Sequence, residues 1–105
     1  MRNGSVSEGA GWNHLVDRHY NPRKNASQFT IPQEELRVLL QSRQVVETPV
    51  TRTLASADGI RYVREVKLAR DVGMDKFSGM QPTSVMTVLT DGFGNLVTAT
   101  PGVIR

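Results

Sequence analysis

The spacing of apolar residues changes once along this chain, and the change restricts the folds that the chain can adopt. Over residues 12–19 and again over residues 30–43, apolar side chains recur every three or four positions, which predicts two amphipathic helices. After residue 44, β-branched residues and apolar–polar alternation predominate, which predicts strands at residues 45–54, 60–68, 83–90 and 95–100. We therefore expect an α+β fold in which two N-terminal helices pack on one face of a four-stranded antiparallel meander sheet.

The boundaries of these elements are marked by residues with strong local preferences. Pro22 disfavours the helical region for Asn21, and is expected to end the first helix there. At the second helix, Thr30 is placed to cap the N-terminus and Gln33 occupies the capping-box position. Residues 23–28 and 71–82 are expected to be connecting loops, since the first is polar and the second contains two glycines.

The composition is typical of one small domain. The 105 residues suffice for a single core, so we expect one domain, residues 11–105, that is monomeric when free. Residues 1–10 are polar and rich in Gly and Ser, without the apolar segment of a signal peptide, and are expected to be a linker remnant. The absence of cysteine excludes disulfides and thiol catalysis. The sequence has no run of about 20 apolar residues, the length that a membrane-spanning helix needs, so we expect no membrane partner. The net charge of +3 is compatible with a polyanionic partner.

Both histidines of the chain, its tryptophan and an arginine fall within residues 12–20. Histidine exchanges protons near neutral pH, so this cluster indicates acid–base chemistry. His14 and Arg18 are four residues apart on the polar side of the predicted helix and can act together, whereas His19 falls on the apolar side. The two imidazoles are about 140° apart on an ideal helix. Both histidines or one alone can thus be catalytic, and a solvated His14 or a hydrogen-bonded core His19 are the structural alternatives.

Three short motifs are similar to those of a known family: His14-x-x-x-Arg18-His19, then Ser27-x-Phe29, and a closing strand Leu96-Val-Thr98-Ala-Thr-Pro101 after a Gly-Asn turn. Together they resemble the C-terminal ribonuclease domains of bacterial polymorphic toxins, which contact-dependent inhibition and Rhs-type proteins deliver. The similarity is greatest to the barnase/EndoU/colicin/RelE-like (BECR) group. The ribonuclease A-like toxin domains share these features, and the motifs alone do not separate the two groups. The resemblance covers about residues 11–105.

This resemblance implies an RNA-cleaving toxin that needs no metal or cofactor. Such a domain is the C-terminus of a larger secreted or cell-surface protein and acts in the cytoplasm of a target cell. We therefore expect RNA, in particular tRNA, as the substrate and a cognate immunity protein as a partner. One departure concerns the predicted sheet, where several such domains keep a further catalytic His or Tyr. Here the sheet has no His, so an Arg, Lys, Thr or Tyr62 would have to serve.

Metal-independent RNA cleavage needs a base for the 2′-OH proton, an acid for the leaving 5′-oxygen and cations for the charge on the phosphorane. The residues expected in the site are catalytic His14, His19, Arg64 and Thr98, phosphate-binding Arg18 and Lys67, and base-stacking Tyr62. Thr98 is assigned through the resemblance, because β-propensity alone explains a strand threonine. Arg64 can equally pair with Asp17 or Glu65, and Lys67 can be a solvated surface charge.

Two functions follow from these residues. The first is an endoribonuclease in which attack by the 2′-OH leaves a 2′,3′-cyclic phosphate. The alternative is a non-catalytic module that binds RNA or a protein through a basic face. Arg64 distinguishes them, since an arginine that faces the same cleft as the histidines favours catalysis and one turned away in a salt bridge favours the module.

Overall fold

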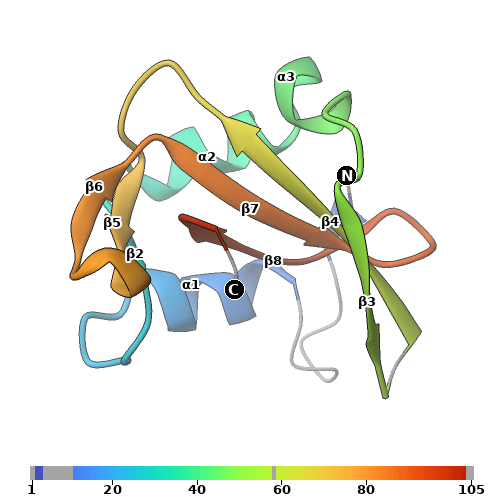
Figure 1. Ribbon diagram of the computed structural model, residues 1–105, viewed down its shortest axis with the longest axis horizontal. Coiled ribbons are helices and arrows are strands. Elements are labelled where there is room, and N and C mark those ends of the chain that lie inside the picture. The colour runs from blue at the N-terminus through green and yellow to red at the C-terminus, as the bar shows by residue number, and fades with distance from the viewer. Residues whose placement is uncertain (1, 4–10, 58, 104–105) are drawn as a thin grey trace.

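The computed structural model describes residues 2–3, 11–57 and 59–103 (Figure 1). Its helices are α1 (Trp12–His19), α2 (Gln33–Leu40), α3 (Arg43–Val46) and the 3₁₀ helix η2 (Lys76–Ser78). Its strands are β1 (Arg2–Asn3), β2 (Gln28–Phe29), β3 (Arg52–Ser56), β4 (Gly59–Lys67), β5 (Gly73–Asp75), β6 (Gln81–Thr83), β7 (Val85–Thr90) and β8 (Asn95–Pro101). Of the expected linker, residues 1–10, all but Arg2 and Asn3 lie outside the described residues. No helix in the described ranges is both long enough and apolar enough to cross a membrane.

The strands form two sheets, one with the order β1-β8-β7-β4-β3 and one with the order β2-β5-β6. The α+β class is confirmed, and β3, β4, β7 and β8 follow the predicted antiparallel meander. The prediction of a single four-stranded sheet is wrong, because β1 pairs in parallel with β8 and a second sheet exists. The second sheet arises mainly in residues 71–82, which were expected to be a loop. Strands of two or three residues are too short to show an alternating pattern.

The two sheets meet at the end of β8. Gly73 of β5 lies so close to β8 that a Cβ atom on it would overlap the side chain of Pro101 and would come within 2.5 Å of the Gln28 carbonyl oxygen. Glycine is therefore needed at this position for the small sheet to pack where it does. This contact brings the turn after β5 next to β8, which is the arrangement on which the candidate site depends.

The helical region departs from the prediction at its C-terminal end. A single helix was expected up to residue 43, followed by a strand from residue 45, but α2 ends at Leu40 and α3 follows. Ser42 caps α3 by accepting the backbone N–H of Val45 at 3.4 Å, and Val45 is fully buried in the core. Packing of Val45 thus outweighs its β-propensity. At the other end, α2 follows Pro32 without a side-chain cap, so the expected role of Thr30 is wrong.

The apolar sides of α1 and α2 cover one face of the larger sheet. Leu15 and Leu36 are fully buried in one cluster with Val66, Met86 and Val88. Val66 lies opposite Met86 in the register, and Val88 is two residues further along β7, so all three strand residues belong to one face. Residues that alternate with them belong to the opposite face.

A bulge in β8 positions α1. The register between β7 and β8 shifts between Leu89 and Thr90, which leaves Val97 as an extra residue. The Val97 carbonyl oxygen accepts the backbone N–H of Gly11 at 2.8 Å. Gly11 precedes α1 with φ of 91°, a conformation that favours glycine. The first turn of the histidine-bearing helix is therefore held next to the middle of β8, one residue before Thr98.

Candidate active site

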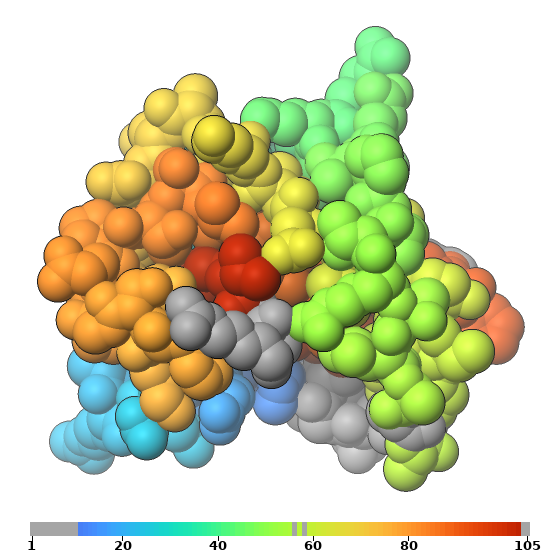
Figure 2. Space-filling view, in the orientation of Figure 1, coloured from blue at the N-terminus to red at the C-terminus, as the bar shows by residue number. Residues whose placement is uncertain are grey.

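Both histidines line one pocket of about 200 Å³, which also contains Arg18, Lys76 and Thr98. Its walls come from α1, the loop after α1, the turn that begins with η2, and β8. In Figure 1 this turn (orange) lies on the same side of the molecule as α1 (blue), and in Figure 2 the surfaces of the two segments adjoin at the lower left. The pocket thus collects basic and hydroxyl groups from three distant parts of the sequence.

His19 is held in a defined orientation. Its Nδ1 lies 2.7 Å from the carbonyl oxygen of Ser27, and because a carbonyl oxygen only accepts, Nδ1 carries the proton. Its ring also meets Phe29 edge to face, with 6.1 Å between the centroids. The neutral ring then has its lone pair on Nε2, the form required of a general base.

The surroundings of His19 keep it neutral. Its side chain is only 7% exposed, and this burial lowers the pKa of His19 below its ordinary value of 6.5. The hydrogen bond to Ser27 acts in the opposite direction, whereas the positive charges of Arg18 and His14 lower the pKa further.

His14 and Arg18 complete the contribution of α1. His14 is half-buried and Arg18 is exposed, so both are accessible from solvent. The backbone of α1 near Arg18 is fixed by Gln28, whose Nε2 donates to the Arg18 carbonyl oxygen at 3.1 Å. Although His14 and His19 are far apart around the helix axis, both contribute to the wall of this pocket. The angular separation predicted from the sequence therefore does not keep the two residues out of one pocket.

Lys76 was not predicted from the sequence as a site residue. It lines the pocket and is positioned there by a hydrogen bond to Ser27. The Ser27 hydroxyl oxygen accepts the backbone N–H of Lys76 at 2.9 Å, and the Lys76 Nζ donates to the Asn25 carbonyl oxygen at 3.0 Å. Ser27 itself is buried, at 4% exposed, and its hydrogen bond to Lys76 is partly buried. The only sequence signal for this residue was a lysine within a loop that contains two glycines, which is too weak to identify a site.

Thr98 contributes a hydroxyl group without a partner. Its Oγ1 is buried, and none of the described residues provides it with a hydrogen bond. A buried hydroxyl normally has a partner, because leaving one unpaired costs about 1–3 kcal/mol. Thr100, two residues further along β8, lines the same pocket. The hydrogen-bonding capacity of the Thr98 hydroxyl is therefore not used by any described residue.

Arg64, Lys67 and Tyr62 do not line the histidine pocket. The Arg64 Nε donates to the Thr48 carbonyl oxygen and its Nη1 donates to the Thr90 Oγ1, each at 3.0 Å. Arg64 lies opposite Val88 in the register, so it belongs to the helix-covered face of the sheet, whereas Thr98 pairs with Leu89 and belongs to the other face.

The other two residues also belong to β4. Lys67 is the exposed last residue of the strand. Tyr62 lines a separate cavity near its start, together with Asp91 and Phe93. The structure therefore separates these three expected site residues from His14, Arg18, His19 and Thr98, which it brings together.

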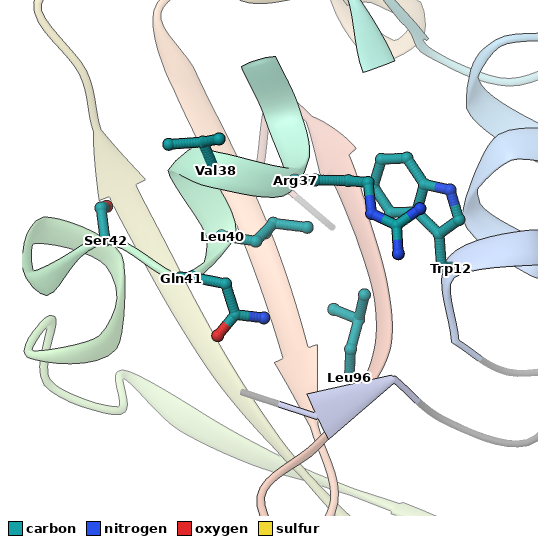
Figure 3. Close-up of a pocket in the computed structure, with 7 residues that line it drawn as sticks. All are labelled: Trp12, Arg37, Val38, Leu40, Gln41, Ser42 and Leu96. Atoms are coloured by element: carbon teal, nitrogen blue, oxygen red, sulfur yellow. The ribbon is translucent and has the colours of Figure 1, made fainter. Parts of the chain in front are cut away.

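A larger cavity of about 640 Å³ lies between α1, α2 and β8 (Figure 3). The Arg37 guanidinium stacks over the Trp12 ring at its mouth, 4.9 Å from the ring centroid, and Leu40 and Leu96 form an apolar wall. Trp12 packs against the core. The residues that line this cavity include no group that titrates near neutral pH, so we place the candidate site in the smaller histidine pocket.

No cluster of three or more His, Asp or Glu side chains suited to a metal ion occurs in the part of the chain that the structure describes. No protein-family model, no curated protein and no solved structure matches this chain. A functional assignment therefore depends on the geometry of the pocket and on the motif resemblance.

Proposed function

We propose that this chain is a metal-independent endoribonuclease that cleaves RNA, with tRNA as the expected substrate, and that it serves as the toxin domain of a larger protein. The observation that carries the proposal is the joint presence of His14, Arg18, His19, Lys76 and the unpaired Thr98 hydroxyl in one pocket. These are the base, acid and charge-stabilising groups that phosphodiester cleavage by the 2′-OH requires.

In this mechanism His19 is the base and His14 is the acid. The His19 Nε2 takes the 2′-OH proton while the 2′-oxygen forms a bond to phosphorus. His14 gives a proton to the 5′-oxygen as the P–O5′ bond breaks. The products are a 2′,3′-cyclic phosphate and a 5′-hydroxyl, so no water is consumed in this step. The lowered pKa of His19, caused mainly by burial, supports its role as the group that begins unprotonated.

Lys76, Arg18 and Thr98 stabilise the charge that develops on the phosphorane. The two cations attract the non-bridging oxygens, and the Thr98 hydroxyl donates a hydrogen bond to one of them. Lys76 thereby takes the place of Arg64, which the sequence led us to expect in the site. The Thr98 Oγ1 has no hydrogen-bond partner among the described residues, and this supports its role as a donor to the substrate.

The direct test is incubation of the purified protein with tRNA in the presence of EDTA, followed by analysis of the product ends. Wild type should give cyclic phosphate and 5′-hydroxyl ends. His14→Ala and His19→Asn should abolish most of the cleavage, and the asparagine can still donate to the Ser27 carbonyl oxygen. Lys67→Gln, on an exposed residue outside the pocket, is the matched control. Absence of cleavage by wild type, or full activity in both histidine variants, would refute the proposal.

A second candidate is a module that binds RNA or a protein without cleaving it, and the position of Arg64 favours it. Arg64 is turned away from the histidines, although its partners are the neutral oxygens of Thr48 and Thr90 rather than a carboxylate. The same incubation separates the two functions, because a binding module would retain RNA at its original length.

The toxin role also implies a neutralising partner. A protein with a carboxylate-rich surface would be attracted to the basic pocket, since complementary charge speeds association. We expect such an immunity protein to cover His14 and Arg18, and we expect the domain to act in the cytoplasm of a target cell. Protection of tRNA by the co-expressed partner would test this part of the proposal.

A further inference from the structure

Phe77 is an exposed aromatic residue at the histidine pocket. Its side chain is 53% exposed, and among the large exposed apolar side chains of the described residues it is the one that lines this pocket. A single exposed aromatic ring needs no explanation by itself. The position of Phe77 beside the basic groups of the pocket is what points to a ligand.

The backbone that presents Phe77 is fixed. The Asp75 carboxylate accepts the Phe77 backbone N–H at 3.0 Å with one oxygen and the Ser78 hydroxyl at 3.1 Å with the other. Asp75 itself is 9% exposed and lies against Gly102, where a Cβ atom would come within 2.5 Å of its carboxyl carbon. The turn is thus ordered before any ligand binds, which reduces the entropy lost on binding.

Positive charge lies beside the ring. The Lys76 ammonium is 5.5 Å from the Phe77 ring centroid, and Arg18 lines the same pocket. An aromatic ring next to cations suits a ligand that combines a planar ring with negative charge, as a nucleotide does. A flat apolar partner without charge would leave the cations unused.

From this arrangement we infer that Phe77 stacks on a nucleobase next to the phosphate held in the histidine pocket, so that the substrate is unpaired RNA rather than a duplex. The inference rests on the proposed function for the location of that phosphate. Within a duplex both faces of a base are covered by its neighbours, and only a base in a loop, bulge or single strand can stack on a protein ring. Every base has such a face, so we expect little preference for base identity from this contact.

The test is binding of a labelled single-stranded 2′-O-methyl RNA of mixed sequence, which lacks the attacking hydroxyl and cannot be cleaved. Fluorescence anisotropy should show roughly tenfold weaker binding by Phe77→Ala, which corresponds to about 1.4 kcal/mol. Phe77→Tyr should bind like wild type. Phe93→Ala is the matched control, because Phe93 is 79% exposed on a different turn and lines another cavity, and its binding should be unchanged.

The outcomes separate this inference from the proposed function. Equal binding by wild type and Phe77→Ala, no binding by wild type, or an equal loss in Phe93→Ala would overturn the stacking role. The same would follow if wild type bound the strand equally well after annealing to its complement. If Phe77 proved essential for binding but unmodified RNA were never cleaved, the stacking role would stand and the ribonuclease would fail.

Discussion

The Ser27 hydroxyl oxygen accepts the backbone N–H of Lys76 at 2.9 Å, across 49 positions of the sequence. The carbonyl oxygen of the same serine accepts the Nδ1 proton of His19 at 2.7 Å. One buried residue therefore sets the positions of the expected base and of an expected phosphate-binding cation. A change in either hydrogen bond should be transmitted to the other group, since both depend on the backbone at Ser27.

Replacement of Thr98 by valine should separate activity from stability. The valine keeps the shape of the side chain but removes a hydroxyl that has no partner among the described residues. Stability in urea unfolding should rise by about 1 kcal/mol. Cleavage should fall by roughly a hundredfold, because a donor to the phosphorane is lost.

Thr87→Val is the control for this substitution. Thr87 is also fully buried, but its Oγ1 donates to the Gly102 carbonyl oxygen at 2.6 Å. This variant should lose about 1 kcal/mol of stability. Equal destabilisation in the two variants would mean that the Thr98 hydroxyl has a structural role.

The buried His19 should make stability depend on pH. Burial lowers the pKa of His19 in the folded protein below the unfolded value of about 6.5. Above about pH 6.5, His19 is neutral in both the folded and the unfolded state, and its titration does not reduce the free energy of unfolding. As the pH falls from about 6.5 towards the folded pKa, the free energy of unfolding decreases, because the unfolded chain takes up the proton first.

Urea unfolding at about pH 5 and about pH 7.5 measures this dependence. His19→Asn retains a donor for Ser27 and cannot titrate, so its stability should change less between the two pH values than that of wild type. Identical changes in both proteins would show that the pKa of His19 is the same in the folded and unfolded states.

Lys76 and Lys67 should differ in their effect on cleavage. Lys76→Gln removes a charge from the pocket, so kcat/KM should fall by about a hundredfold, and Lys76→Arg should restore part of it. Lys67→Gln changes a residue at the exposed end of β4 and should alter kcat/KM by no more than about twofold. Steady-state kinetics on one RNA substrate compares them. A larger effect at Lys67 would restore the assignment made from the sequence.

Gly73→Ala should weaken the junction between the two sheets. The added methyl group would overlap Pro101 and the Gln28 carbonyl oxygen, both of which are constrained, so the free energy of unfolding should fall by roughly 2–3 kcal/mol. Gly92→Ala is a suitable comparison, because the nearest atom to its Cβ is 4.0 Å away on Tyr62. Thermal unfolding of the two variants should place Gly73→Ala well below Gly92→Ala. Similar midpoints would argue against close packing at Gly73.

The elements that the sequence predicts well are those with a long enough pattern. Helix α1 has the predicted bounds, 12–19, because its apolar spacing and Pro22 agree, and the nine-residue β4 forms one residue earlier than predicted, although Ile60 is exposed and Val63 on the other face is fully buried. By contrast, α3 contains two adjacent valines that favour a strand locally, and β5 and β6 are three residues long. These elements are determined by tertiary packing, which local preferences do not encode.

The same distinction applies to the pocket. His14, Arg18 and His19 could be found because one helix carries all three, and Thr98 came from the motif resemblance. Lys76 and Phe77 could not, since the hydrogen bond that places this turn joins residues 49 positions apart. Arg64 was expected in the same site as Thr98, but the sequence contains no signal that the two residues belong to opposite faces of the sheet.

The bond between the Gly11 amide and the Val97 oxygen involves main-chain atoms alone. A substitution that changes only the Val97 side chain therefore leaves this hydrogen bond intact. Deletion of Val97 removes the acceptor, and because Val97 is the extra residue of the bulge, Leu96 and Thr98 can keep their partners in β7. Shortening the strand by one position is therefore a way to remove one of the contacts that hold α1 against β8 without altering any group of the proposed reaction.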